Sequence, residues 1–193
     1  RMTPAGEVTE FATGLATGLA SYGRHPFIEF GGTWHSGDEM TEYRDRLAAV
    51  LSDAGVAADD PVGIVVRNRL PPAAAILGFV ATGRPVVMIY GFQSDRAIAT
   101  DLEALRLAAV VADRDDWTEP VLTAARRTGS AAVALSLTEP RVKSLSARGD
   151  PTPDPALRGA GVHILTSGTT GPPKRVPIRT EVLAHTVRSI THG

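Results

Sequence analysis

The sequence predicts a three-layer α/β fold, in which a mainly parallel sheet carries helices on both faces. Runs of consecutive apolar residues recur along the chain, as in Val62–Val66 and Ala131–Leu135. Such runs are typical of parallel strands that are buried on both faces. Segments with helical spacing alternate with these runs, and repeated strand–helix–strand units of this length form parallel sheets.

The N-terminal part is expected to form a helix, a small hairpin and a second helix. Apolar residues recur every four positions within Glu7–Tyr22, which predicts the first helix. Two short strands, Pro26–Phe30 and Thr33–His35, follow on either side of a Gly-Gly turn. Ser36 and Glu39 have the spacing of a capping box, in which each side chain accepts a hydrogen bond from the other's backbone amide. The second helix is therefore expected to begin here.

The remaining elements of the predicted sheet follow in order. The second helix should end at Gly55, after burying Met40, Tyr43, Leu47, Val50 and Leu51. Further strands are expected at Val62–Val66, Pro85–Ile89, Ala108–Ala112 and Ala131–Leu135. Helices are expected at Ala73–Ala81 and at Asp95–Leu105, where Ser94 caps the second of the two. A further helix should run from Asp115 or Asp116 to Arg127, and Gly129 should end that helix.

The character of the chain changes after Leu135. Residues 136–159 are polar, contain four prolines and show no usable periodicity, which predicts a linker or a long surface loop. We therefore expect three parts: an α/β unit over residues 2–135, a Pro-rich polar linker over 136–159, and a strand, phosphate loop, strand and helix over 160–193.

The composition excludes several classes of function. The 20 basic and 21 acidic residues give a net charge of −1, so we expect no binding of nucleic acid or of an anionic membrane surface. The absence of cysteine excludes disulfides, thiolate nucleophiles and iron–sulfur clusters. No apolar stretch approaches the roughly 20 residues of a membrane span, and no export signal is visible. We expect a soluble, cytoplasmic protein.

The segment after Val162–Thr166 carries the chemistry. It reads Ser-Gly-Thr-Thr-Gly-Pro-Pro-Lys, from Ser167 to Lys174. Glycines allow the backbone to approach a ligand closely, and consecutive backbone amides can form an anion-binding nest. Hydroxyl donors and the Lys174 ammonium add further groups that bind phosphate. A loop of this composition is suited to the phosphates of a nucleotide.

This loop differs from a Walker A loop, which opens directly into a helix and carries Ser or Thr after its lysine. Here two prolines separate Gly171 from Lys174, and Arg175 follows the lysine. Val176 and Ile178 then alternate as residues of a strand do. The loop is therefore expected to join two strands.

The segment Leu165–Lys174 closely resembles the phosphate-binding motif of the adenylate-forming (AMP-binding) superfamily, which includes acyl-CoA synthetases, nonribosomal-peptide adenylation domains and luciferases. Three earlier stretches, Trp34–Met40, Leu47–Val66 and Ala81–Ile89, are similar to further elements of the family in the family's order. The resemblance covers nearly the whole chain but only about the first third of a complete enzyme. It implies an α/β fold, the first part of the family's N-terminal domain.

The resemblance also implies a reaction. ATP and a carboxylic acid give an acyl-adenylate and pyrophosphate, and the acyl group then passes to the thiol of coenzyme A or of a carrier protein. The residues that would bind ATP are Thr166, Ser167, Gly168, Thr169, Thr170, Gly171 and Lys174. The family uses Mg²⁺, and Thr166 occupies the position of a threonine that can ligate it.

This sequence departs from the family pattern at several positions. Arg175 replaces the usual glycine after the lysine, and could either stiffen the loop or add a phosphate contact. Thr180 stands where a histidine is common, and Met88 and Tyr90 replace a usual proline and Asp or Asn. These departures affect the subfamily more than the fold.

The later motifs of the family, including its catalytic lysine, are absent from this segment, so we expect an N-terminal fragment of an acyl-CoA synthetase-like ligase that is inactive alone. The surface that the remainder would cover should favour self-association. Two alternatives stay open. One is a fragment of a nonribosomal-peptide-type adenylation domain. The other is a non-catalytic nucleotide-binding module that a partner chain completes.

Overall fold

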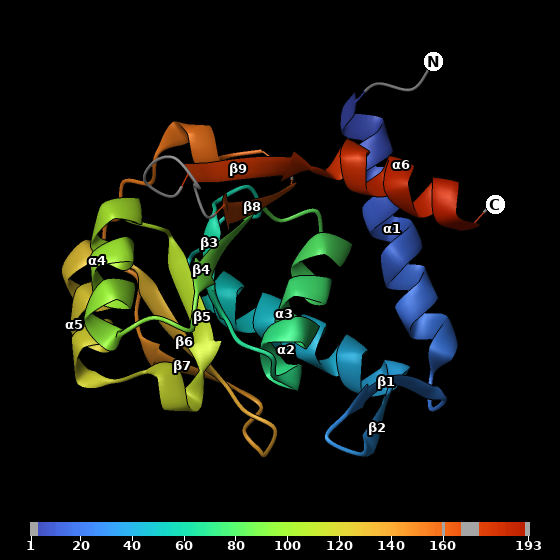
Figure 1. The fold of residues 1–193 in the computed structure, drawn as a ribbon, viewed down its shortest axis with the longest axis horizontal. Coiled ribbons are helices and arrows are strands. Elements are labelled where there is room, and N and C mark those ends of the chain that lie inside the picture. Colours follow the sequence, from blue (N-terminus) through green and yellow to red (C-terminus); the bar gives the residue numbers. More distant parts are fainter. Residues whose placement is uncertain (1–3, 160, 167–173, 192–193) are drawn as a thin grey trace.

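The computed structural model of this chain describes residues 4–159, 161–166 and 174–191, and its centre is a seven-stranded sheet (Figure 1). The strand order is β7-β6-β5-β3-β4-β8-β9. The five inner strands are parallel, whereas β7 and β9 are antiparallel to their neighbours at the two edges. The strands are β3 (Val62–Val66), β4 (Val86–Tyr90), β5 (Ala109–Asp113), β6 (Ala131–Leu135), β7 (Val142–Ser146), β8 (Gly161–Thr166) and β9 (Lys174–Arg179).

Helices cover both faces of this sheet, which confirms the predicted three layers. The helices α2 (Gly37–Asp53) and α3 (Leu70–Ala81) pack on one face, and α4 (Asp95–Leu105) and α5 (Glu119–Thr128) pack on the other. The helix α1 (Pro4–Tyr22) contacts α2, α3 and α6 (Thr180–Thr191) (Figure 1). A separate antiparallel pair, β1 (Pro26–Phe30) and β2 (Thr33–Ser36), precedes α2. None of the helices in the described part of the chain combines the length and hydropathy that crossing a bilayer requires.

The inner strands are buried on both faces, as their apolar runs predict. In β3, Ile64 belongs to the core beneath α2 and α3, whereas Val65 belongs to the core beneath α4 and α5. Alternate residues of a strand point to opposite faces, so one short apolar run supplies both cores. The predicted face of α2 is also confirmed, since Met40, Tyr43, Leu47 and Leu51 are buried and Val50 is partly buried.

The helix starts follow local signals in the sequence. Ser36 and Glu39 form the predicted capping box at α2, with Ser36 Oγ 3.2 Å from the Glu39 amide and Glu39 Oε2 2.8 Å from the Ser36 amide.

The predicted start of a helix at Asp115 or Asp116 is wrong. These residues form a single 3-10 turn, and α5 begins at Glu119. Pro120 explains the difference, because proline has no backbone N–H to donate and is accommodated in the first turn of a helix.

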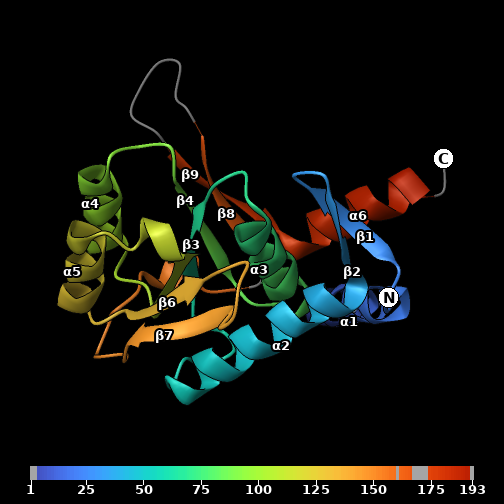
Figure 2. The ribbon, with the colours of Figure 1, turned by 90° about the horizontal axis from the view of Figure 1, so that it is seen from below.

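The predicted linker over residues 136–159 contains one strand that the sequence analysis missed. β7 pairs with β6 in an antiparallel arrangement and lies along α2 (Figure 2). Its sequence, Val-Lys-Ser-Leu-Ser, has little strand propensity. Backbone pairing with the buried strand β6 therefore sets its conformation, and this pairing is a tertiary contact that periodicity does not reveal.

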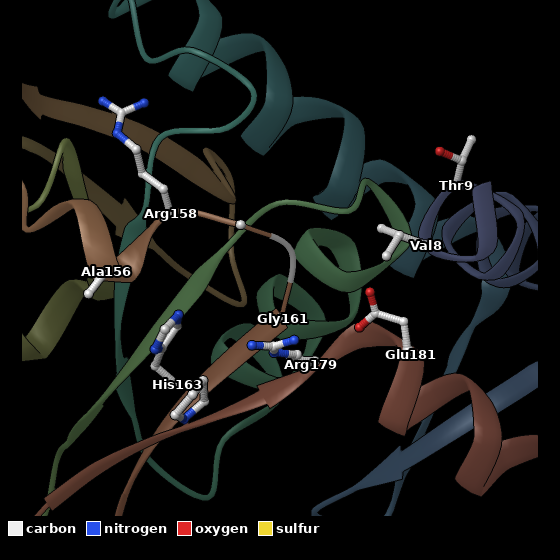
Figure 3. Close-up of a pocket in the computed structure, with 10 residues that line it drawn as sticks. Val8, Thr9, Ala156, Arg158, Gly161, His163, Arg179 and Glu181 are labelled. Atoms are coloured by element: carbon white, nitrogen blue, oxygen red, sulfur yellow. The ribbon is translucent and has the colours of Figure 1, made fainter. Parts of the chain in front are cut away.

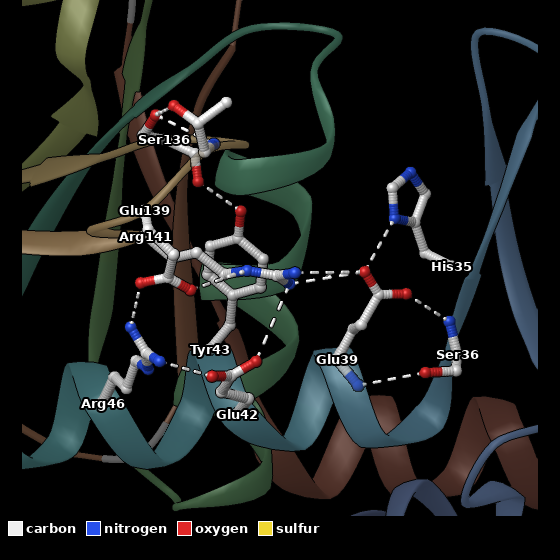
Figure 4. Close-up of polar contacts among 10 residues, drawn as sticks. His35, Ser36, Glu39, Glu42, Tyr43, Arg46, Ser136, Glu139 and Arg141 are labelled. Atoms are coloured by element: carbon white, nitrogen blue, oxygen red, sulfur yellow. Dashed lines mark hydrogen bonds and ion pairs between the residues drawn. The ribbon is translucent and has the colours of Figure 1, made fainter.

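A network of ion pairs joins α2 to the connection between β6 and β7 (Figure 4). Arg46 lies 2.6 Å from both Glu42 and Glu139, and Arg141 lies 3.4 Å from Glu39 and from Glu139. Burial acts to raise the pKa of Glu39, but the hydrogen bonds that it accepts and the nearby Arg141 hold this pKa below its usual value. The Glu39 carboxylate therefore has two roles, because it caps α2 and also pairs with an arginine from the edge of the sheet.

Candidate functional site

The inner parallel strands end at one edge of the sheet, and the segments that follow them meet there. Val66, Tyr90, Asp113 and Thr166 are the last residues of β3, β4, β5 and β8. In open α/β sheets, ligands bind outside this carboxyl-terminal edge, where neighbouring connections leave in opposite directions. Here the chain passes from β3 to β4 on one side of β3 and then returns to β5 on its other side. By this rule, the strand order predicts that a ligand would bind at this edge.

The predicted phosphate loop connects β8 to β9 at this edge. Six register pairs join the two antiparallel strands, from Gly161↔Arg179 to Thr166↔Lys174. The Thr166 hydroxyl donates a hydrogen bond to the backbone carbonyl of Lys174 (3.0 Å). The described chain is therefore a strand up to Thr166 and again a strand from Lys174, as predicted, whereas a helix would follow a Walker A loop.

Of the residues predicted to bind ATP, Thr166 and Lys174 are described by the structure, which places them opposite each other at the ends of the two strands. Lys174 is exposed and Thr166 is partly exposed. Each therefore retains access to solvent at the end of its strand. The other predicted residues are Ser167, Gly168, Thr169, Thr170 and Gly171, and they lie outside the described residues.

Arg175 directs its side chain back onto the sheet. Its Nη1 donates a hydrogen bond to the backbone carbonyl of Met88 on β4 (2.6 Å). Burial lowers the pKa of Arg175, and the carboxylate of Asp101 on α4 acts in the opposite direction. The sequence left two roles open for Arg175, stiffening of the loop or a phosphate contact, and the described bond of its side chain is to β4.

His163, on β8, is buried, with 7% of its surface exposed. It lies close enough to Arg175 on β9 for the two charges to interact. Burial lowers the pKa of His163, the positive charge of Arg175 lowers it further, and a hydrogen bond with the Leu157 backbone opposes both effects. Because the lowered pKa favours the uncharged ring, the arginine and the histidine do not bring two positive charges together at neutral pH.

The connections after β3, β4 and β5 are tied together by a second arginine. Arg67 lies 5.7 Å from the ring centroid of Phe92 and donates a hydrogen bond to the Asp116 carboxylate (2.5 Å). Burial raises the pKa of Asp116, and Arg67 opposes this effect. The exposed ring of Tyr90 lies 5.7 Å from that of Phe92. The sequence analysis missed Arg67, and its position directly after a buried strand was the signal that could have found it.

The aspartates at the end of β5 and directly after it take part in ion pairs with arginines. Arg69 lies 3.3 Å from Asp113 and 3.6 Å from Asp115. Within the ranges that the structure describes, no group of three or more histidine, aspartate or glutamate side chains has the arrangement of a metal site. The acidic cluster therefore fits ion pairing with the arginines that follow β3.

A cavity of about 560 Å³ lies at the opposite end of the β8–β9 hairpin (Figure 3). Its lining includes Gly161 at the start of β8, Arg179 at the end of β9, and His163. Arg158 also lines it and pairs with Asp59 (3.2 Å) and Asp60 (3.1 Å). This cavity is separate from the ends of the strands where Thr166 and Lys174 lie.

Comparison with known proteins agrees with this architecture. Residues 15–193 match the family described as AMP-binding enzyme. The chain is 31% identical over 167 residues to the "Medium/long-chain-fatty-acid--CoA ligase FadD6" of Mycobacterium tuberculosis, a match that covers 80% of this chain and 26% of that protein. It is 29% identical over 166 residues to "Surfactin synthase subunit 2" of Bacillus subtilis, with 83% of this chain and 4% of that protein covered.

Solved structures show the same fold. The ATP-bound form of MatB from Rhodopseudomonas palustris superimposes with a TM-score of 0.68 at 20% identity, covering 94% of this chain and 37% of that one. Of the fatty-acid CoA ligase from Mycobacterium tuberculosis, the chain spans about a quarter of the length. The family match over residues 15–193 and the 31% identity to a ligase together show that this chain belongs to the AMP-binding enzyme family.

Proposed function

We propose that this chain is the phosphate-binding part of an ATP-dependent ligase, which activates a carboxylic acid as an acyl-adenylate and transfers the acyl group to a thiol. The observation that carries the proposal is the β8–β9 hairpin, which presents Thr166 and Lys174 on opposite sides of the Ser-Gly-Thr-Thr-Gly-Pro-Pro segment. The end of the hairpin that carries these two residues lies at the carboxyl-terminal edge of the parallel strands, where α/β folds bind ligands. The family match supports ATP as the nucleotide.

In this proposal the loop binds the triphosphate. The backbone amides and hydroxyls of Ser167–Gly171 donate to the phosphate oxygens, and the Lys174 ammonium supplies a positive charge. These groups stabilise the negative charge that grows on pyrophosphate as it leaves. Donors that are positioned in advance do this without the cost of reorganising solvent.

We further propose that Thr166 is a magnesium ligand, the role that the family resemblance implies for it. Its O–H donates to the Lys174 carbonyl, so the lone pairs of its oxygen are directed away from that bond. Mg²⁺ takes oxygen ligands and usually binds through a few protein groups together with substrate phosphates and water. When bound there, Mg²⁺ would neutralise phosphate charge. The proposed site would therefore combine the Thr166 hydroxyl with the phosphates of ATP.

The thiol that accepts the acyl group is either coenzyme A or a carrier protein. The chain has similar identity to a protein named as a CoA ligase and to one named as a surfactin synthase subunit, so both acceptors are consistent with it. We further propose the division into an α/β unit over residues 2–135, a connecting segment over 136–159 and the hairpin unit over 160–193.

The experiment that tests the proposal measures acid-dependent exchange of pyrophosphate into ATP by the full-length protein that contains this chain. The acids tested should include fatty, aromatic, dicarboxylic and amino acids, with CoA absent. We expect exchange with at least one class. A folded full-length protein that binds ATP but catalyses no exchange with any class would support the non-catalytic alternative, a nucleotide-binding module that a partner chain completes.

A further inference from the structure

The hairpin that carries the proposed phosphate site has little main-chain attachment to the rest of the sheet. β8 and β9 are joined by six register pairs, from Gly161↔Arg179 to Thr166↔Lys174. β8 and β4 are joined by two, Val86↔Val162 and Val87↔His163. Beyond His163, the half of β8 that leads to Thr166 therefore extends without a described register pair to β4.

The side chain of Arg175 bridges this gap. Arg175 pairs in register with Leu165 and immediately follows Lys174. Its Nη1 donates to the carbonyl oxygen of Met88 at 2.6 Å. Met88 is one residue beyond the last register pair of the β4–β8 ladder. The guanidinium thus provides a contact between the hairpin and β4 where main-chain pairing has ended.

The surroundings of Arg175 favour this placement. The side chain is partly buried, and Asp101 on α4 provides an opposite charge that raises its pKa against the effect of burial. His163 carries a lowered pKa and is therefore mostly uncharged at neutral pH. A charged donor bound to a carbonyl forms a stronger hydrogen bond than a neutral one.

We propose that Arg175 is a positioning residue, which anchors the base of the phosphate-binding hairpin to β4 and so holds Lys174 in place before ATP binds. This inference rests on the proposed function. A hairpin that is already held in place loses less conformational freedom when the nucleotide binds, and its affinity is higher for that reason. Arg175 thereby acts through Lys174 and the backbone of the hairpin, without a contact of its own to the triphosphate.

The test compares three variants of the full-length protein. Arg175→Met removes the donor and keeps an unbranched apolar stem. Arg175→Lys keeps a positive charge and an ammonium nitrogen that can donate, and the described bond uses a single nitrogen. Arg179→Met is the matched control, since it removes an exposed arginine from the same strand at the end away from Lys174.

Two measurements are made on each variant. The first is the KM for ATP and for the acid in pyrophosphate exchange. The second is the hydrogen exchange, without nucleotide, of the backbone amides of β9, which are those of residues 174–176, 178 and 179 because residue 177 is a proline. For Arg175→Met we expect the KM for ATP to rise about tenfold, the size of effect that loss of one charge-assisted hydrogen bond produces. The KM for the acid and kcat should stay within about twofold. Arg175 holds the hairpin in place before ATP binds, so its loss weakens ground-state and transition-state binding of ATP equally, and a loss of such uniform binding raises KM alone. Amide exchange should become faster by about tenfold.

The conservative variant Arg175→Lys should recover most of the ATP affinity, and Arg179→Met should match the unchanged protein in both measurements. A raised KM for ATP with unchanged amide exchange would indicate a direct phosphate contact and overturn the positioning role. Faster amide exchange with an unchanged KM for ATP would reduce Arg175 to a structural residue and also overturn it. Absence of exchange activity in the unchanged protein would contradict the proposed function itself, and with it the role given to Arg175.

Discussion

The phenol of Tyr43 on α2 donates a hydrogen bond to the backbone carbonyl of Ser136 (2.5 Å), 93 residues further along the chain. Both residues are buried, and burial raises the pKa of Tyr43 to about 12. The phenol is therefore protonated, and able to donate, over the whole physiological range. This bond connects α2 to the end of β6 and lies beside the ion-pair network of Arg141 (Figure 4).

Tyr43→Phe should lower the free energy of unfolding by about 1–3 kcal/mol, because the buried Ser136 carbonyl loses its donor. The measurement is urea unfolding of the 193-residue chain. Tyr22→Phe is the control, since Tyr22 is 46% exposed, and it should change the free energy by less than about 0.5 kcal/mol. Equal effects of the two substitutions would show that the bond adds nothing to stability.

Gly37→Ala should destabilise the packing of α1 against α2. A Cβ at Gly37 would lie 2.5 Å from Tyr22 Cβ and 2.6 Å from the Leu19 carbonyl oxygen, so the two helices must separate, at a cost of about 1–3 kcal/mol. Gly14→Ala is the matched control on α1, where a Cβ would meet nothing within 4 Å. Alanine there should increase stability by roughly 0.5–1 kcal/mol. Thermal unfolding distinguishes the two, and a stable Gly37→Ala variant would contradict the close approach.

His163 should make stability depend on pH. Its pKa is lowered in the folded chain by burial and by Arg175, so below the unfolded value of about 6.5 the unfolded chain binds a proton more readily than the folded chain. The free energy of unfolding should therefore decrease as the pH falls from about 6.5 toward the folded pKa, and should not depend on His163 at higher pH. Urea unfolding over this pH range measures the effect.

His163→Asn should remove this part of the pH dependence, because asparagine does not titrate. His25→Asn replaces an exposed histidine and should leave most of the dependence in place. If the curves for His163→Asn and the unchanged chain have the same slope below about pH 6.5, then the folded pKa of His163 is not lowered.

Lys174→Ala should slow adenylation in the full-length protein while leaving its unfolding temperature unchanged, since Lys174 is exposed. Loss of one charge-assisted contact to a phosphate costs about 1.5–3 kcal/mol, or about one to two orders of magnitude in rate. Lys143 is the one other lysine in the sequence and lies exposed on β7, so Lys143→Ala is the control. Unchanged pyrophosphate exchange in Lys174→Ala would remove Lys174 from the site.

The 193-residue chain by itself should show no acid-dependent pyrophosphate exchange. Adenylation requires the carboxylate and the α-phosphorus to be held in line, an alignment that supplies on the order of 7–11 kcal/mol of the barrier. This chain offers groups for the triphosphate, and in an open, hydrated site each such contact is weakened by screening. Exchange by the purified chain with any fatty or aromatic acid would show that it is sufficient for catalysis.

Local patterns in the sequence determined most of the elements, whereas the phosphate chemistry of the loop stays a prediction. Val62–Val66 and Ala131–Leu135 were predicted with the bounds that the structure has, because strands buried on both faces must be apolar throughout. Ser36 and Glu39 predicted the start of α2 because a capping box involves neighbours in sequence. The alternation of Val176 and Ile178 predicted that a strand follows the loop.

Tertiary structure decided the features that depend on residues far apart in the sequence. The conformation of β7 comes from pairing with β6, and the direction of Arg175 comes from a carbonyl on β4, 87 residues away. In the same way, Arg67 meets Asp116 because the strand order places β3 beside β5. A local pattern records which face of an element is apolar, but the partner of a polar side chain depends on which strands become neighbours when the sheet forms.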